Sequence, residues 1–350
     1  MAGRDKIFII IVSYNSQKYW SDLLPTLAQE SYADFDLEIV IVDNNSSDDS
    51  VTYIKEHYPQ FTLFEQKTNL GFTGANNLAY EYALAQGAKY IYLLNPDTKI
   101  NPGFLGPLYD FAKMHPFGSL QSKINLWPQT DHLNSSGNAI NFLGFGYCLD
   151  WNKPDDKALL VKKIDYASGA GVFLSMAALN KKGGLFAPNL FMYLEDLDLG
   201  WSLNLLGFDN YLIPASQIYH KYEFKRSIKQ VYWFEHNRLW VYLKNYSLAT
   251  IILLTPAYLI MELGQLFFAI KNHYLLSKLK AYAWLFSVSE WRNLLAARKQ
   301  IQSSRIRSDR QVVSNFSGKI LFQPLNSWAL ALANFAFNIY WQIVKLIIFW

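Results

Sequence analysis

Apolar and polar positions alternate in blocks over the first 126 residues. Four short apolar runs, each long enough for one buried strand, are separated by amphipathic stretches of helical length. These runs lie at residues 7–12, 38–42, 61–66 and 90–94. Buried strands that alternate with amphipathic helices are typical of a parallel sheet with crossover helices. The pattern therefore predicts an α/β fold built on a parallel core sheet flanked by helices.

Polar side chains follow each of these four runs. They are Ser13, Tyr14 and Asn15 after the first run, Asp43, Asn44, Asn45 and Ser46 after the second, Thr68 and Asn69 after the third, and Asn95 and Asp97 after the fourth. In open α/β sheets, ligands bind in the crevice outside the carboxyl ends of the strands. We therefore expect the four polar endings to converge on one site.

The chain changes character after these runs. Residues 127–170 are rich in Gly, Asn, Ser and Trp, which predicts loops and short hairpins. Two later segments, 246–270 and 328–350, carry one charged residue each and are long enough to be considered for crossing a bilayer. We expect one domain at residues 1–225, with halves that meet at residue 126, and a basic, apolar helical region at 226–350.

Composition excludes several classes of protein. Hydrophobic residues make up 51% of the chain and charged residues 17%, below the ~25% charged share of typical soluble domains. This balance excludes intrinsic disorder for most of the chain. The single cysteine, Cys148, cannot form an intrachain disulfide or a cysteine-based zinc site, so the fold depends on packing.

Charge divides the chain into an acidic and a basic part. Residues 1–220 carry 15 Lys and Arg against 23 Asp and Glu, whereas residues 221–350 carry 17 against 5. Such a basic part usually faces a polyanion, either nucleic acid or anionic lipid. Its many aromatic and aliphatic residues favour an anionic membrane surface, and we expect no nucleic-acid partner.

The last apolar segment has a polar stripe along one side of its predicted helix, formed by Asn334, Asn338, Gln342 and Lys345. Helices of this kind lie at membrane interfaces, although a span that packs against a partner and a buried soluble helix stay open. Residues 271–319 carry ten Lys and Arg against two acidic residues, an excess that short external loops avoid. The first apolar run is too short for a signal peptide. We therefore expect the chain at the cytoplasmic face of the cell membrane.

The residues after the first strand exclude two common nucleotide-binding classes. A dinucleotide-binding dehydrogenase needs G-x-G-x-x-G at this point, whereas residues 12–17 read Val-Ser-Tyr-Asn-Ser-Gln. The P-loop pattern G-x-x-x-x-G-K-[ST] does not occur anywhere in the sequence. The predicted crevice must therefore serve another chemistry.

Six segments, in order and spacing, resemble family 2 inverting glycosyltransferases of the GT-A fold, and the nearest group is rhamnosyltransferase-like. The segments are Val-Ser-Tyr-Asn at 12–15, Ile-Val-Asp-Asn-Asn-Ser-Ser-Asp at 41–48, Asn-Leu-Gly-Phe at 69–72 with Asn-Asn at 76–77, Leu-Asn-Pro-Asp-Thr at 94–98, Ser-Gly-Ala-Gly at 168–171 and Tyr-Leu-Glu-Asp-Leu-Asp-Leu-Gly-Trp at 193–201. The resemblance covers about residues 1–225. It implies that residues 1–126 bind a nucleotide sugar and residues 127–225 an acceptor.

For the donor side, the resemblance implies that a nucleoside diphosphate sugar contacts Ser13, Tyr14, Asn15, Asp43, Asn69, Gly71, Asn76 and Asn95. Asp43 is suited to accept a hydrogen bond from a pyrimidine N–H, and Tyr14 offers a ring beside the base. The alternative for residues 43–46 is a capped turn before the next helix, because Asp, Asn and Ser suit such positions.

For the metal, the family carries an Asp-x-Asp motif, or a reduced form of it, where this chain has the single carboxylate Asp97. The position of His220 matches that of a further metal ligand in some relatives. A hard cation such as Mg²⁺ or Mn²⁺ binds carboxylate oxygen and can complete its shell with substrate phosphates. The alternatives are a turn residue for Asp97 and a satisfied surface histidine for His220.

On the acceptor side, the resemblance gives Asp196 the role of general base and places Gly169, Ala170, Glu195 and Trp201 beside the acceptor. The alternative is helix capping, since carboxylates in a first helical turn are favourable. One departure concerns the phosphates: relatives commonly have Arg after the Trp of this motif, whereas this chain has Ser202. Candidates to replace that cation are Lys221, Lys225 and Arg226.

These expectations describe an inverting glycosyltransferase of cell-surface polysaccharide or glycolipid biosynthesis. The sugar would pass from a nucleoside diphosphate to a glycan or a lipid-linked saccharide. Two alternatives stay open at this point: a transferase that acts on a polyisoprenyl phosphate, and a membrane-bound scaffold that retains the fold without catalysis.

Overall fold

The four apolar runs form four adjacent parallel strands. The computed structural model describes residues 3–221, 228–321 and 328–350. In it, β1 (Asp5–Ser13) lies between β4 (Tyr90–Leu94) and β2 (Phe35–Asp43), and β3 (Thr62–Glu65) pairs with the far side of β2. All three pairings are parallel, as the alternation of strands and helices predicts.

Alternate residues of these strands face two separate layers of helices. Ile7, Ile9 and Ile11 pack with the buried side chains of α1 (Gln17–Leu27) and α4 (Leu105–Met114). Phe8 and Ile10 point the other way, toward α3 (Gly71–Ala85), α5 (Met176–Lys182) and α6 (Glu195–Leu205). The strand period of two therefore accounts for a sheet that is apolar on both faces.

Strands in both directions extend the sheet beyond β4, in the order β10–β12–β6–β11–β4–β1–β2–β3, with β11 and β10 antiparallel to their neighbours. The sequence did not predict β12 (Asn210–His220), which runs parallel to β6 (Ser119–Leu126) with a register shift between Ile213 and Gln217. Pro214 lies in this shift, where a missing ladder N–H costs least. The α/β expectation is confirmed, with a mixed sheet around a parallel core.

The remaining strands and helices are short connections or belong to the C-terminal region. The strands are β5 (Thr98–Ile100), β7 (Leu133–Ser135), β8 (Asn138–Ile140), β9 (Gly146–Cys148), β10 (Lys162–Ile164) and β11 (Gly171–Ser175). The helices are α2 (Ser50–His57), η1 (Pro188–Leu190), α7 (Ile228–Asn245), α8 (Leu248–Lys271), α9 (Leu275–Ala281), η2 (Ala283–Phe286), α10 (Val288–Ser304), α11 (Asp309–Val312), η3 (Val313–Asn315) and α12 (Trp328–Ile347).

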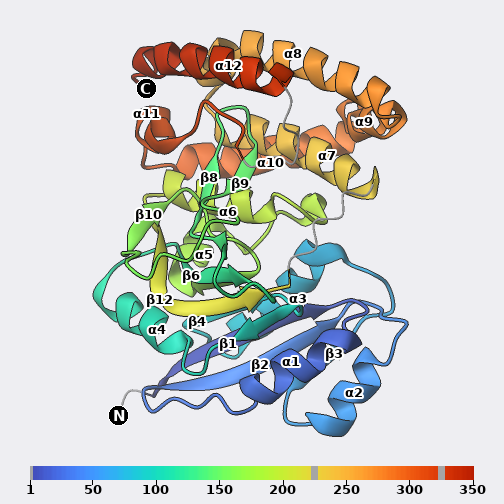
Figure 1. Cartoon of the computed structure of the whole chain (residues 1–350), viewed down its shortest axis with the longest axis vertical. Helices are drawn as coiled ribbons and strands as arrows, with labels where there is room; N and C mark the ends of the chain where they lie inside the picture. The colour runs from blue at the N-terminus through green and yellow to red at the C-terminus, as the bar shows by residue number, and fades with distance from the viewer. Residues whose placement is uncertain (1–2, 222–227, 322–327) are drawn as a thin grey trace.

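The C-terminal helices form two layers at one end of the molecule. In Figure 1, α7 and α10 lie next to the sheet region, and α8 and α12 lie across them as an outer layer. One apolar cluster joins the two regions. Its members include Trp201 of α6, Trp240 of α7, Trp341 of α12, and Phe316, which follows η3. The β8–β9 hairpin reaches the same cluster, and Phe142 N–H donates to the Ser317 carbonyl at 3.0 Å. The C-terminal helices therefore share a core with the α/β region.

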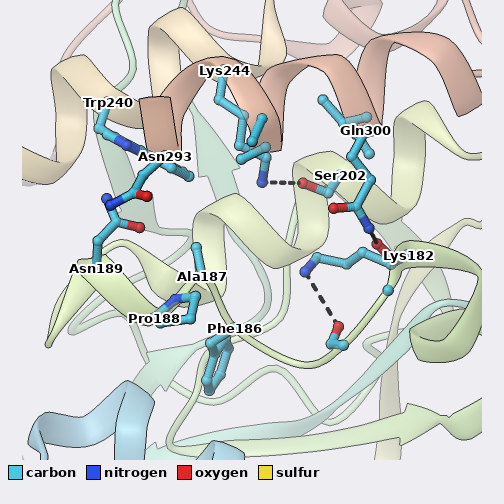
Figure 2. A pocket seen from close by; sticks show the side chains of 15 residues that line it. Lys182, Phe186, Ala187, Pro188, Asn189, Ser202, Trp240, Lys244, Asn293 and Gln300 are labelled. Carbon is cyan, nitrogen blue, oxygen red and sulfur yellow. Dashed lines mark hydrogen bonds between the residues drawn. The ribbon is translucent and has the colours of Figure 1, made fainter. Parts of the chain in front are cut away.

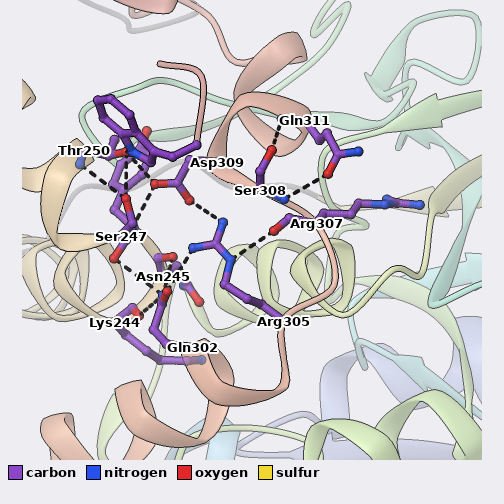
Figure 3. A network of polar contacts seen from close by, with 12 residues as sticks. Lys244, Asn245, Ser247, Thr250, Gln302, Arg305, Arg307, Ser308, Asp309 and Gln311 are labelled. Atoms are coloured by element: carbon purple, nitrogen blue, oxygen red, sulfur yellow. Dashed lines mark hydrogen bonds and ion pairs between the residues drawn. The ribbon is translucent and has the colours of Figure 1, made fainter. Parts of the chain in front are cut away.

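A buried carboxylate ties three of these helices together. Asp309, 1% exposed at the start of α11, accepts hydrogen bonds from the backbone N–H of Ser247, from the Thr250 hydroxyl at the start of α8, and from Arg305 just beyond α10 (Figure 3). Gln302 of α10 adds a bond from its amide to the Asn245 carbonyl at 2.8 Å. These contacts fix the outer helix α8 relative to the helices beneath it.

The outer layer exposes large apolar side chains, and the predicted polar stripe of α12 faces the protein only in part, because Gln342 is exposed. Of the predicted polar stripe, Asn334 exchanges hydrogen bonds with the backbone of Ile320, and the Lys345 ammonium donates to the Ser314 carbonyl. Large apolar side chains face outward from both helices: Leu248, Ile252, Leu259, Ile260, Leu263, Phe267 and Ile270 on α8, and Leu332, Phe335, Ile339, Ile343 and Leu346 on α12. By length and composition, the segments Leu248–Lys271 and Leu330–Ile347 are each able to cross a membrane, and little of either is buried.

Candidate active site

The end of β2 presents a carboxylate with one oxygen free for a ligand. Asp43 is 2% exposed, and its Oδ2 accepts the backbone N–H of Ser46 at 2.9 Å. Its Oδ1 is buried and has no hydrogen-bond partner among the described residues. The capped turn that was the structural alternative thus exists, yet it uses one oxygen only. The other can accept from the N–H of a bound base.

Side chains at the end of β2 also shape the loop before α3. The Asn44 amide donates to Asn69 Oδ1 at 3.0 Å, and Asn69 Oδ1 accepts the Gly71 N–H at 2.8 Å. Gly71 has φ +73°, and a Cβ there would lie 2.6 Å from the Phe191 carbonyl oxygen. Only glycine suits this backbone and this close approach. The loop therefore brings the donor-side motif against residues 190–194.

A path of hydrogen bonds joins the end of β4 to the predicted base. Asn95 N–H donates to the Ala170 carbonyl at 3.1 Å, and Gly169 N–H donates to Asp196 Oδ2 at 3.2 Å. Asp196 Oδ1 accepts the Leu197 N–H at 2.8 Å. The structure therefore brings three of the predicted segments together at one edge of the sheet.

The two predicted metal ligands are neighbours. His220 Nε2 lies 3.2 Å from Asp97 Oδ1, because β5 pairs with the end of β12 and places Thr98 opposite His220. His220 Nδ1 lies 3.3 Å from Asn134 Oδ1, a contact that orients the ring. Among the described residues no three His, Cys, Asp or Glu side chains form a metal-binding group. The donor set suits a divalent cation that takes its remaining ligands from phosphates and water.

Burial changes the electrostatics of the two carboxyls at the start of α6. Desolvation raises the pKa of Asp196 to about 6, while hydrogen bonds from the Gly169 and Leu197 N–H groups oppose the shift. Burial and the neighbouring Asp196 charge raise the pKa of Glu195 well above its usual value, and Glu195 Oε2 has no partner among the described residues. Glu195 therefore keeps its proton to higher pH than an ordinary glutamate does, and Asp196 can take a proton near neutral pH.

This assignment predicts an acid limb in the rate profile. A base must be deprotonated, so kcat/KM should be constant above pH about 6 and fall nearly tenfold per pH unit below it. An ordinary aspartate would place the limb near pH 4. A profile of kcat/KM between about pH 4.5 and 8.5 measures its position. A flat profile down to pH 5 would exclude Asp196, with its raised pKa, as the base.

Helix α7 contributes residues that sequence reasoning missed. Asn237, fully buried, donates from its side-chain amide to the carbonyls of Leu190, Met192 and Tyr193 at 2.7–2.9 Å. The rings of Trp233 and Phe234 stack on Phe191 and Tyr193, with centroids 4.8 and 4.5 Å apart.

The segment that α7 holds has an unusual backbone. Phe191, Tyr193 and Leu194 have φ of +46°, +68° and +62°, a region that costs energy for residues with side chains. Asp196 begins α6 immediately after them. The packing of α7 therefore maintains the conformation that presents the predicted base. No motif signals this, because the partners are more than 40 residues apart in sequence.

Other predicted site residues lie in less direct positions. Tyr14, just after β1, is 54% exposed, and Asn15 Oδ1 accepts the Ser47 N–H at 2.8 Å. Ser13 and Asn76 are buried, and the Asn76 amide donates to the Phe72 carbonyl within α3.

The acceptor-side expectation for Trp201 finds no support in its position. Its side chain is 1% exposed and packs edge-on against Tyr246 and Phe316 in the core shared with the C-terminal helices. The reason is helical geometry: five positions after Asp196, the Trp201 side chain lies on another face of α6, toward Tyr246 and Phe316.

The position after Trp201 also faces α7, and a cation is present there. The Lys244 ammonium donates to Ser202 Oγ at 2.9 Å and to both oxygens of Asp198 at 2.7 and 2.6 Å. Lys221, a candidate replacement, pairs with Asp22 of α1. The other candidates, Lys225 and Arg226, lie outside the described residues.

Comparisons with known proteins agree with this geometry. Residues 8–189 match glycosyl transferase family 2. The N-acetylglucosaminyl-diphospho-decaprenol L-rhamnosyltransferase of Mycobacterium tuberculosis is 25% identical over 236 residues, which cover 62% of this chain and 76% of that protein.

Two solved structures share the fold. The structure of Staphylococcus aureus TarS residues 1–349 superposes with a TM-score of 0.50 and 18% identity, over 97% of this chain and 90% of that one. The structure of GalNAc-T7 with UDP, GalNAc and Mn²⁺ gives a TM-score of 0.54 and 14% identity over 69% of this chain, which spans about half (48%) of its length. The chain belongs to glycosyl transferase family 2 and is a glycosyltransferase with a GT-A fold and an apolar helical C-terminal region.

Proposed function

We propose that the chain transfers a sugar from a nucleoside diphosphate to a saccharide acceptor, free or lipid-linked, with inversion at the anomeric carbon. The observation that carries this proposal is the link between Asp196 and the donor edge of the sheet, through Gly169, Ala170 and Asn95. The relative from M. tuberculosis is named for rhamnosyl transfer to a lipid-linked diphosphate saccharide. A role in cell-surface polysaccharide biosynthesis, with a lipid-linked saccharide as acceptor, follows from that likeness.

Three aspartates have separate roles in the reaction: Asp43, Asp97 and Asp196. Asp43 Oδ1 accepts from an N–H of the base and holds the nucleoside. Asp97 and His220 would hold a divalent cation, and such a cation would supply positive charge beside the diphosphate. Asp196 removes the proton of the acceptor hydroxyl while that oxygen bonds to the anomeric carbon and the bond from this carbon to the diphosphate oxygen breaks. Attack on the face opposite the diphosphate inverts the anomeric configuration.

A thermal-shift screen of nucleoside diphosphates and their sugars, with Mn²⁺ or Mg²⁺, tests the donor class. Binding stabilises the folded protein by RT ln(1 + [L]/Kd), about 2.7 kcal/mol at 100 times Kd, so the right nucleotide raises the melting temperature. TarS has been solved with UDP-GlcNAc and GalNAc-T7 with UDP and Mn²⁺, so uridine nucleotides are the first to test. If no nucleoside diphosphate shifts the melting temperature, the proposed function is wrong.

The metal assignment makes a separate prediction. Asp97→Ala should abolish the part of nucleoside diphosphate binding that depends on Mn²⁺ or Mg²⁺, because it removes the carboxylate ligand. Titration of the nucleotide with and without the cation measures this part. Asp22→Ala, which removes a nearby carboxylate that pairs with Lys221, serves as the control and should retain the cation dependence. Full transfer activity in excess chelator would contradict the assignment.

We further propose that the outer layer of α8 and α12 rests on the cytoplasmic face of the membrane. The boundary between the catalytic region and the membrane-facing region then lies near residue 225. Large apolar side chains of this layer are exposed, whereas Asn334 and Lys345 of the α12 stripe contact the protein, a pattern that an ordinary soluble surface helix does not show. Exposed cations, among them Lys271 and Lys280, flank the layer and suit anionic lipid.

Vesicle flotation measures this docking. Phe267→Asp should lower binding to vesicles that contain phosphatidylglycerol by about tenfold or more. The substitution replaces an aromatic side chain that inserts into the lipid by a charged one. Met114→Asp is the matched control, because Phe267 and Met114 are 71% and 70% exposed but Met114 ends α4, far from the layer in Figure 1. Equal binding of both variants would contradict the proposal.

A further inference from the structure

A cavity of about 330 Å³ lies between the α5–α6 connection and helices α7 and α10. Its volume falls in the range of small-ligand sites. Figure 2 shows Trp240, Asn293 and Asn189 on one side of it and Lys244, Gln300 and Lys182 on the other, with the two ammonium groups directed toward the middle. Asn293 and Gln300 are exposed and form its mouth. None of these residues belongs to the crevice at the strand ends.

The polar groups deep in this cavity are hydrogen-bond donors. Trp240 Nε1 and Asn189 Nδ2 are buried and have no acceptor among the described residues, and the Trp240 side chain is 1% exposed. A buried N–H without an acceptor costs about 1–3 kcal/mol. Two such groups on one wall therefore indicate a ligand that brings acceptors.

The cavity also carries positive charge. The Lys182 ammonium donates to the carbonyls of Gly184 and Leu185 at 3.3 and 3.1 Å, and no described carboxylate pairs with it. Lys244 is neutralised by Asp198, so the excess charge belongs to Lys182. Burial and the Lys244 charge lower the pKa of Lys182 to about 8. A bound anion would offset both effects.

We propose that this cavity binds a small soluble oxyanion, phosphate or diphosphate, at a site separate from the donor crevice. The oxyanion accepts hydrogen bonds from Lys182, Trp240 and Asn189, which are charge-assisted and hence strong. The wall formed by η1 runs directly into residues 191–194, which precede Asp196. The ligand thus sits between α10 and the segment that presents the base.

Indole ¹⁵N–¹H NMR of the full chain tests the proposal. The chain has 11 tryptophans, and Trp240→Phe identifies the Trp240 signal. Inorganic phosphate, titrated without divalent cations at constant ionic strength, should move this signal along a saturable binding curve. Lys182→Met should weaken the titration about tenfold or more, because a hydrogen bond to a charged group is lost. The other indole signals report whether the variant is folded.

Two controls locate the effect. Lys181→Met, at the exposed neighbouring position, and Asp97→Ala, in the donor crevice, should leave the Trp240 titration unchanged. The proposal is overturned if phosphate does not move the Trp240 signal, or if Lys182→Met leaves the titration as it is. A shift that occurs only with vesicles of phosphatidylglycerol, and not with free phosphate, would also overturn it.

Discussion

Asp196→Asn is expected to lower kcat about 10²-fold or more and to leave donor affinity unchanged. The amide keeps the shape of the side chain, and its one oxygen can still accept the N–H of Gly169 or of Leu197, which bond to different oxygens of Asp196. It cannot take the proton of the acceptor hydroxyl, so only the transition state loses stabilisation. Steady-state transfer rates and a donor titration measure the two quantities separately.

Glu195→Gln is the matched control for this variant. Burial and the Asp196 charge raise the pKa of Glu195 well above its usual value, so this carboxyl favours the neutral form, which glutamine reproduces. We expect kcat within about threefold of the wild type and an acid limb that stays near pH 6. Near wild-type turnover in Asp196→Asn would return this pair of carboxyls to a helix-capping role.

Lys244→Met is expected to cost about 3–5 kcal/mol of the free energy of unfolding. It leaves Asp198, 1% exposed, without its counter-ion, and a buried unpaired charge is far more costly than the ion pair is favourable. Urea unfolding measures the loss. Because Asp198 lies two residues after Asp196, the same variant should also reduce transfer.

Two comparisons make this result specific. Asp198→Asn combined with Lys244→Met removes both charges and should recover most of the stability, since Asn245 can still donate to the new amide oxygen. Lys113→Met breaks an exposed pair with Asp110 and should leave the free energy of unfolding nearly unchanged. Equal losses in Lys244→Met and in the double variant would contradict the ion-pair argument.

The strand pattern sufficed to predict the parallel core and the meeting of the strand ends. A buried strand in an α/β sheet must be apolar along its length, and the polar residues after it mark where the hydrogen-bonded ladder stops. The predicted ends of β1, β2 and β4 therefore lie within three residues of the observed ends. The partnership of Asp97 with His220 came from the family resemblance alone. Its geometry depends on β12, whose Pro214 and register shift interrupt the alternation that sequence reasoning uses.

Contacts between distant segments were beyond the reach of the sequence. The hydrogen bonds from Asn237 to residues 190–193 and from Lys244 to Ser202 depend on how α7 packs against α6. A helix pattern defines which face is apolar but not which helix will cover it. For the same reason the polar stripe of α12 was visible in the sequence, whereas the contact of Asn334 with Ile320 was not.

The anomeric configuration of the first product tests the central claim most directly. With the donor found in the thermal-shift screen and a saccharide acceptor, ¹H NMR during the first turnovers reads the configuration at the transferred carbon. A single displacement assisted by Asp196 predicts the configuration opposite to that of the donor. A product that retains the donor configuration would contradict the account.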